Sequence, residues 1–157
     1  MESYNRDMDI HMMLYSPSAL IESDYSGLLG VESATAYWGL STFSPDISIL
    51  LLNDDSLSDE GYECESSLCF LAVPKVNDTN VIKLSPHFCV TDREQTICDM
   101  IRYKRHEFHL YETILSAYDD NEVDIERLES LAKSYNILDR LKSLYVEACE
   151  IYDIEEG

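Results

Sequence analysis

The chain has 157 residues, of which 45% are hydrophobic, and its 31 aspartates and glutamates against 11 lysines and arginines give a formal net charge of −20. This hydrophobic content is typical of a globular domain with a buried core and excludes a disordered acidic tail. A small domain usually carries a net charge of about 2–8. A charge as large as −20 repels phosphate backbones, so direct binding of DNA or RNA is not expected.

A flexible arm and two short helices are expected first in the chain. Residues 1–13 are rich in Met, Asp and Asn, which is typical of a loosely held arm. A proline at the first helical position predicts a helix from Pro17 to about Tyr25. Gly27 and Gly30 are expected to bracket a turn, and a second short helix is expected over Ser33–Leu40.

Three apolar runs predict a small sheet in the middle of the chain. Ile47–Leu52 and Leu68–Val73 are rich in branched residues, as buried strands are. A third strand is expected over Val81–Leu84, which could continue through Phe88–Val90. The polar, acidic residues from Asn53 to Gly61 are expected to form a loop.

Four helices are predicted after Thr91. Thr91 and Glu94 have the spacing of a capping box, which opens the first of them. Apolar residues three and four apart indicate three more helices, which begin near His106, Asp124 and Asn136. The side chains expected on the buried faces are Ile97, Cys98 and Ile101; Phe108, Tyr111, Leu115 and Tyr118; Ile125, Leu128, Leu131, Ala132 and Tyr135; and Leu138, Leu141, Tyr145, Ala148 and Tyr152. The predicted fold class is α+β, with short N-terminal helices, a small β-sheet and four packed C-terminal helices in a single domain over residues 1–157.

Carboxylates are concentrated in a stretch without any basic residue. No lysine or arginine occurs between Arg6 and Lys75, and this stretch holds twelve aspartates and glutamates. Uncompensated negative charge destabilises the folded chain through self-repulsion, which suggests that the charge has a function. We expect this function to be docking onto a strongly basic surface. The candidate partner-binding residues belong to the segment Asn53–Glu65, here called the acidic segment, and are Asp54, Asp55, Asp59, Glu60, Glu63 and Glu65. The alternative is a solvated loop; the ligand pattern of a calcium loop is absent from this segment.

Metal-binding and catalytic candidates each have a structural alternative. Cysteines and a histidine in the sheet region lack the spacing of zinc fingers or ribbons, so buried, reduced cysteines are expected instead; the residues are Cys64, Cys69, His87 and Cys89. His106 and His109 lie three apart without an apparent third ligand and are interpreted as surface histidines. Asp99 and Glu94 could form an acid–base pair, but the capping box explains Glu94. No metal, no cofactor and no enzymatic activity are therefore predicted.

Arg102, Lys104 and Arg105 form the one positive cluster of the sequence. Cations favour the C-terminal end of a helix because they complement the helix dipole, and a helix end is expected here. The alternative is that this cluster pairs with the acidic face of a second copy of the chain. The oligomeric state is left open by the sequence.

Neither a membrane span of about 20 apolar residues nor a signal peptide is apparent. The five cysteines are an odd number without secretory context, which indicates reduced thiols. A cytoplasmic location without a membrane partner is therefore expected.

Short motifs along the chain resemble the C-terminal domain of the AbiEi antitoxin family, from abortive-infection toxin–antitoxin pairs. Ser33–Leu40 (SATAYWGL) is similar to a helix of that domain, and Arg93–Ile101 (REQTICDMI) is similar to the helix start that follows its strands. The stretch from Leu128 to Leu141 is similar to the last helices of the family. Members normally begin with a basic winged helix-turn-helix that binds their own promoter, and the acidic start of this chain does not match that module.

The resemblance implies an antitoxin that acts against a nucleotidyltransferase toxin, without the promoter binding. The expected function is non-enzymatic neutralisation of a basic nucleic-acid-handling enzyme through the acidic segment. The alternative is a phage or mobile-element inhibitor on the same scaffold, a DNA mimic that blocks a CRISPR-Cas or restriction nuclease.

Overall fold

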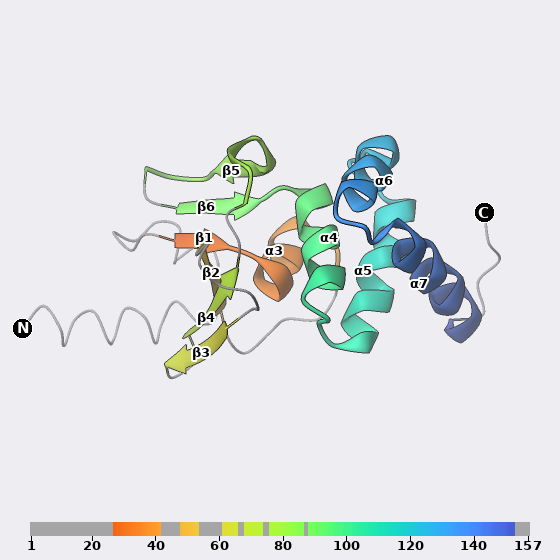
Figure 1. The fold of residues 1–157 in the computed structure, drawn as a ribbon, viewed down its shortest axis with the longest axis horizontal. Helices are drawn as coiled ribbons and strands as arrows, with labels where there is room; N and C mark the ends of the chain where they lie inside the picture. The colour runs from red at the N-terminus through yellow and green to blue at the C-terminus, as the bar shows by residue number, and fades with distance from the viewer. Residues whose placement is uncertain are drawn as a thin grey trace, which may run out of the picture. The chain divides into compact units, whose positions relative to one another are not determined.

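The computed structural model describes residues 27–41, 48–53, 61–65, 68–73, 76–86 and 88–152 (Figure 1). The chain divides into two compact units, one of residues 1–34 and 45–91 and the other of residues 35–44 and 92–157. We call them the sheet unit and the helical unit. The expected arm over residues 1–13 and the expected helix from Pro17 to Tyr25 lie outside the described residues. The single domain over residues 1–157 stays a prediction.

The sheet unit is built on a six-stranded sheet with the order β3-β4-β2-β1-β6-β5. Its strands are β1 (Gly27–Leu29), β2 (Ser48–Asn53), β3 (Gly61–Glu65), β4 (Leu68–Val73), β5 (Val81–Lys83) and β6 (Phe88–Thr91), and the 3-10 helix η1 (Asp78–Asn80) precedes β5. β1 is parallel to β6 and β2 is parallel to β4, while the other neighbours are antiparallel. The predictions of β2 and β4 are confirmed.

Three details of the sheet differ from expectation. Gly27 and Leu29 belong to strand β1, in the interior of the sheet, rather than to a turn. β3 begins at Gly61, directly after the expected acidic loop. Val81–Lys83 and Phe88–Thr91 form two antiparallel strands rather than one interrupted strand, because the chain reverses at Ser85, whose Oγ accepts a hydrogen bond from the Phe88 amide at 3.0 Å.

Helix α3 (Val31–Trp38) begins directly after β1 and forms the predicted second helix. Gly30, which joins the two elements, lies against Leu51 of β2, and a Cβ at this position would overlap the Leu51 side chain. The core of the sheet unit is made of buried side chains from these elements: Leu29, Val31, Ala34, Leu51, Leu71, Val73, Phe88 and Val90.

The helical unit contains the four predicted C-terminal helices: α4 (Arg93–Arg102), α5 (Glu107–Asp119), α6 (Ile125–Ser134) and α7 (Leu138–Ile151). α4 packs against α6, and α5 packs against α7. Fully buried side chains from all four helices form the core: Ile97, Met100, Ile114, Leu128, Leu141 and Ala148. The α+β fold class with its helical C-terminal part is therefore confirmed.

One predicted helix cap and parts of the predicted buried helix faces are wrong. The N-cap of α4 is Asp92, whose carboxylate accepts a hydrogen bond from the Gln95 amide at 2.8 Å, and not Thr91, which ends β6. In α5, Phe108 is 59% exposed, because the buried face is one that includes Leu110 and Ile114. At the end of α7, Tyr152 is 45% exposed.

Three helices end with the same backbone turn, in which one residue adopts a positive φ. These residues are Gly39 (φ 70°) after α3, Lys104 (φ 49°) after α4 and Asn136 (φ 60°) after α6. At α4 the amides of Lys104 and Arg105 donate hydrogen bonds to the carbonyls of Ile101 and Met100, which is the Schellman pattern. Glycine is the residue that this conformation favours, so a lysine at position 104 is held with backbone strain.

Candidate functional site

The acidic segment is described in the structure only at its end. Asp54, Asp55, Asp59 and Glu60 lie outside the described residues. Glu63 and Glu65 belong to β3, which stands at the end of the sheet next to β4. Among the described strands, β3 is therefore an edge strand.

An edge strand offers unpaired backbone amides and carbonyls to another chain. The backbone of Glu63 is paired with Phe70 of β4, and that of Glu65 is paired with Leu68. Charged residues on an edge strand oppose indiscriminate pairing with other strands. Two of the predicted partner-binding residues, Glu63 and Glu65, therefore lie on the outermost described strand at this end of the sheet.

Four carboxylates of the helical unit, those of Asp92, Glu94, Asp99 and Glu147, form ion pairs with arginines. Arg127 of α6 donates to Asp92 at 2.7 Å and forms a second, short ion pair with Glu94. Burial raises the pKa of Glu94 above its usual value, and the hydrogen bond from Arg127 opposes this rise. Glu94 therefore joins α4 to α6 instead of capping α4, which corrects the predicted capping box.

Asp99 is fully buried in a polar network between α4 and α6. Its carboxylate accepts hydrogen bonds from Gln95 Nε2 at 2.8 Å and from Arg102 Nη1 at 3.3 Å. The Arg102 guanidinium lies 3.8 Å from the ring centroid of Tyr135, whose hydroxyl donates to Gln95 Oε1 at 3.1 Å.

Burial raises the pKa of Asp99 to about 7 although these hydrogen bonds oppose the rise. Because Asp99 is 0% exposed, this carboxyl group has no direct access to a substrate. Asp99 accepts hydrogen bonds from Gln95 and Arg102, and these two side chains reach Tyr135 at the end of α6 through a hydrogen bond and a cation–π contact, so the network ties the two helices together.

Among the cysteine candidates, Cys89 is half-buried rather than buried, and the side chains of Cys64 and Cys69 lie outside the described part of the chain. Cys98 is fully buried as a free thiol, and burial raises its pKa to about 12, so it is a poor nucleophile. His109 is buried rather than on the surface, which corrects the prediction, whereas His106 is exposed. His87 lies outside the described residues. Within the described ranges, no cluster of three or more histidine, cysteine, aspartate or glutamate side chains is arranged to hold a metal ion, and no helix has the length and apolar content of a membrane span.

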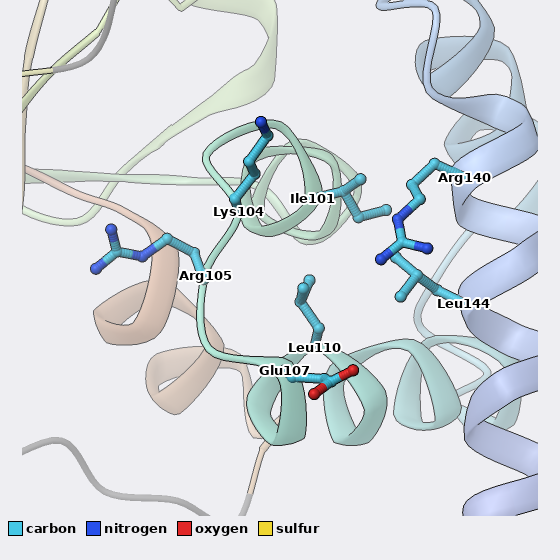
Figure 2. Close-up of a pocket in the computed structure, with 7 residues that line it drawn as sticks. All are labelled: Ile101, Lys104, Arg105, Glu107, Leu110, Arg140 and Leu144. Carbon is cyan, nitrogen blue, oxygen red and sulfur yellow. The ribbon is translucent and has the colours of Figure 1, made fainter.

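A pocket of about 260 Å³ lies between α4, α5 and α7 in the helical unit (Figure 2). Its walls combine apolar side chains with charged side chains of both signs. The lining residues are Ile101, Lys104, Arg105, Glu107, Leu110, Arg140 and Leu144. The predicted positive cluster lies at the C-terminal end of α4, as expected, and two of its members, Lys104 and Arg105, line this pocket. The sequence does not link Arg140 to this cluster, because Arg140 belongs to α7 and is distant from Arg105 along the chain.

A chain of polar contacts borders the pocket and connects two of its charged residues. The Tyr111 hydroxyl lies 2.7 Å from Glu107 Oε1 and 3.2 Å from Glu147 Oε2. Glu147 in turn forms an ion pair with Arg140 at 3.7 Å. The hydrogen bond to Glu107 raises the pKa of Tyr111 to about 12, so the phenol stays protonated at neutral pH.

No protein-family model and no curated protein matches this chain. The resemblance of Ser33–Leu40 and Arg93–Ile101 to AbiEi antitoxins therefore stays a prediction from these short motifs.

Proposed function

We propose that this chain is a non-enzymatic, antitoxin-like protein that neutralises a basic nucleic-acid-handling enzyme, such as a nucleotidyltransferase toxin, in the cytoplasm. The observation that carries the proposal is the unequal distribution of cations. The ion pairs described in the structure join Asp92, Glu94, Asp99 and Glu147 to arginines of the helical unit. The stretch from Asp7 to Pro74 contains twelve carboxylates and no lysine or arginine at all.

This charge distribution supports a binding role through its effect on association. A concentrated negative field accelerates the encounter with a positively charged surface and selects such partners, more than it adds raw affinity. Among the described strands β3 stands at the edge of the sheet, where its backbone groups would pair with a partner strand. Both features would let the acidic segment occupy the nucleic-acid groove of an enzyme.

The second candidate is a phage or mobile-element inhibitor that mimics DNA and blocks a CRISPR-Cas or restriction nuclease. The net charge of −20 favours this candidate, since it disfavours binding to promoter DNA. The neighbouring genes distinguish the two candidates: a toxin gene beside this one indicates an antitoxin, and a cluster of anti-defence genes indicates an inhibitor.

The test is a charge-neutralised variant of the acidic segment that carries Asp54→Asn, Asp55→Asn, Asp59→Asn and Glu60→Gln. The candidate partner is the enzyme that a neighbouring gene encodes, and its association rate and activity are measured across a salt series. We expect slower association, a shallower salt dependence and weaker inhibition with the variant, because charges interact over about 10 Å at 0.1 M salt.

A matched control removes four charges from exposed positions of the helical unit, namely Asp119→Asn, Glu122→Gln, Glu126→Gln and Glu150→Gln. It should keep near wild-type kinetics. Equal kinetics for both variants would mean that net charge serves solubility alone, and retardation of duplex DNA by the wild-type chain in a gel shift would contradict the proposal directly.

A further inference from the structure

The pocket between α4, α5 and α7 has opposite charges on an apolar floor. Ile101, Leu110 and Leu144 contribute the apolar side chains. In Figure 2 the Arg140 side chain extends from α7 towards Ile101 and Leu110, and the Glu107 carboxylate lies below Leu110 on α5. A ligand that contacts all these groups needs one anionic end, one cationic end and an aliphatic part between or beside them.

The Glu107 carboxylate lines the pocket and already accepts one hydrogen bond. A tyrosine hydroxyl carries one proton, but the Tyr111 hydroxyl lies within 3.2 Å of two carboxylates, those of Glu107 and Glu147. The shorter contact places this proton on the hydrogen bond to Glu107. A carboxylate has about four acceptor sites, so an ammonium group, with three donors and a positive charge, would bind Glu107 beside the Tyr111 hydroxyl.

Arg140 supplies the complementary site for an anion. Its distance of 3.7 Å from Glu147 is that of an ion pair without a direct hydrogen bond. The guanidinium has five N–H donors in a planar fork that fits a carboxylate. Lys104 and Arg105 point away from Arg140 in Figure 2, so they add positive field at this wall without a direct contact.

We propose that this pocket binds a small aliphatic α-amino acid in its zwitterionic form. The ligand carboxylate would pair with Arg140, the ammonium with Glu107, and the side chain would cover Ile101, Leu110 and Leu144. The volume of about 260 Å³ fits this size class, since sites for drug-sized ligands measure roughly 300–1,000 Å³. The binding site does not depend on the neutralising function proposed above.

The experiment is a titration of the full chain with L-leucine, followed by the methyl NMR resonances of Leu110 and Leu144. N-acetyl-L-leucine lacks the ammonium, and L-leucinamide lacks the carboxylate. Leucine should shift these resonances saturably in the millimolar range. Each derivative should bind at least about tenfold more weakly, which corresponds to ~1.4 kcal/mol.

Two variants assign the ends of the ligand. Arg140→Gln should weaken leucine binding and leave leucinamide binding unchanged, and Glu107→Gln should weaken leucine binding and leave N-acetyl-leucine binding unchanged. Both residues are exposed, so folding is preserved, and Lys142→Gln on the same helix is the control that keeps wild-type binding. Absence of a saturable shift with leucine, or equal responses to all three compounds, would overturn the proposal.

Discussion

Replacing Gly30 with alanine tests how tightly the sheet unit is packed at the junction of β1 and α3. A Cβ at this position would lie within 2.8 Å of Cγ, Cδ1 and Cδ2 of Leu51. Leu51 is 4% exposed, so its side chain has no solvent to move into. Overpacking of this kind costs about 1–3 kcal/mol, and because Cγ as well as the two methyl groups must shift, we expect a value in the upper half of that range.

A double-mutant cycle with Leu51→Ala separates this overlap from other effects of the methyl group. Leu51→Ala removes all three overlapping atoms and alone should cost about 2–5 kcal/mol, through the cavity that it leaves. In the double variant the Gly30→Ala methyl group has room and fills part of this cavity. The double variant should therefore be more stable than the sum of the single changes predicts by about 1–3 kcal/mol.

Equilibrium urea unfolding of the four proteins gives the free energies. Gly39→Ala is the matched control, because Gly39 has a positive φ and nothing within 4 Å of its ideal Cβ position. It should cost about 1 kcal/mol through backbone strain and add independently to Leu51→Ala. If Gly30→Ala costs less than about 0.5 kcal/mol, or is additive with Leu51→Ala, the packing argument for Gly30 is refuted.

Three further predictions concern the helical unit. Asp99→Asn should stabilise the protein above pH 7 and make its free energy of unfolding depend less on pH. Folding raises the Asp99 pKa from 3.8 to about 7, so protonated Asp99 adds up to ~4 kcal/mol to the free energy of unfolding. This contribution is fully present below pH 3.8 and is lost as the pH rises through about 7, whereas asparagine does not titrate. Lys104→Gly should raise the unfolding free energy by about 1 kcal/mol, since glycine relieves the positive φ. Leu128→Ala should cost about 2–5 kcal/mol, whereas Phe108→Ala should cost less than about 0.5 kcal/mol.

Urea unfolding measures all of these changes, with the Asp99 variant followed across pH 4–9. An Asp99→Asn profile parallel to that of the wild type would show that the group titrates alike in both states. A loss of stability in Lys104→Gly would mean that the lysine side chain makes contacts that outweigh its backbone strain. Equal costs for Leu128→Ala and Phe108→Ala would contradict the assignment of the buried helix faces.

The helices and two strands could be predicted because their signals are local. Apolar residues three and four apart determine where α4 to α7 lie, and continuous branched runs identify β2 and β4. The buried face of α5 was predicted less well. Phe108 and Leu110 are both apolar, and only the packing of α5 against α7 decides that Leu110 is buried and Phe108 exposed.

The strands that were missed depend on pairing between distant residues. β1 has only three residues, begins with Gly27 and is followed by Gly30, a pattern that is typical of a turn, and it becomes a strand by pairing with β2 and β6. The same holds for the N-cap of α4: Glu94 has the spacing of a capping box with Thr91, but Arg127, 33 residues later, takes its carboxylate. The pocket could not be predicted either, because its walls come from three helices.

The position of β1 in the sheet also has a consequence for synthesis of the chain. Gly27–Leu29 is parallel to Phe88–Val90, so one side of β1 has no neighbour until the ribosome has released residue 90. During that interval β1, β2, β4 and β3 can assemble with an open edge in what later becomes the interior of the sheet, the kind of edge at which nascent chains join one another. Every carboxylate between Asp7 and Glu65 has by then been made and no lysine or arginine beyond Arg6 and Lys75 precedes Lys83. Two such unfinished chains therefore already repel each other while their sheets are incomplete.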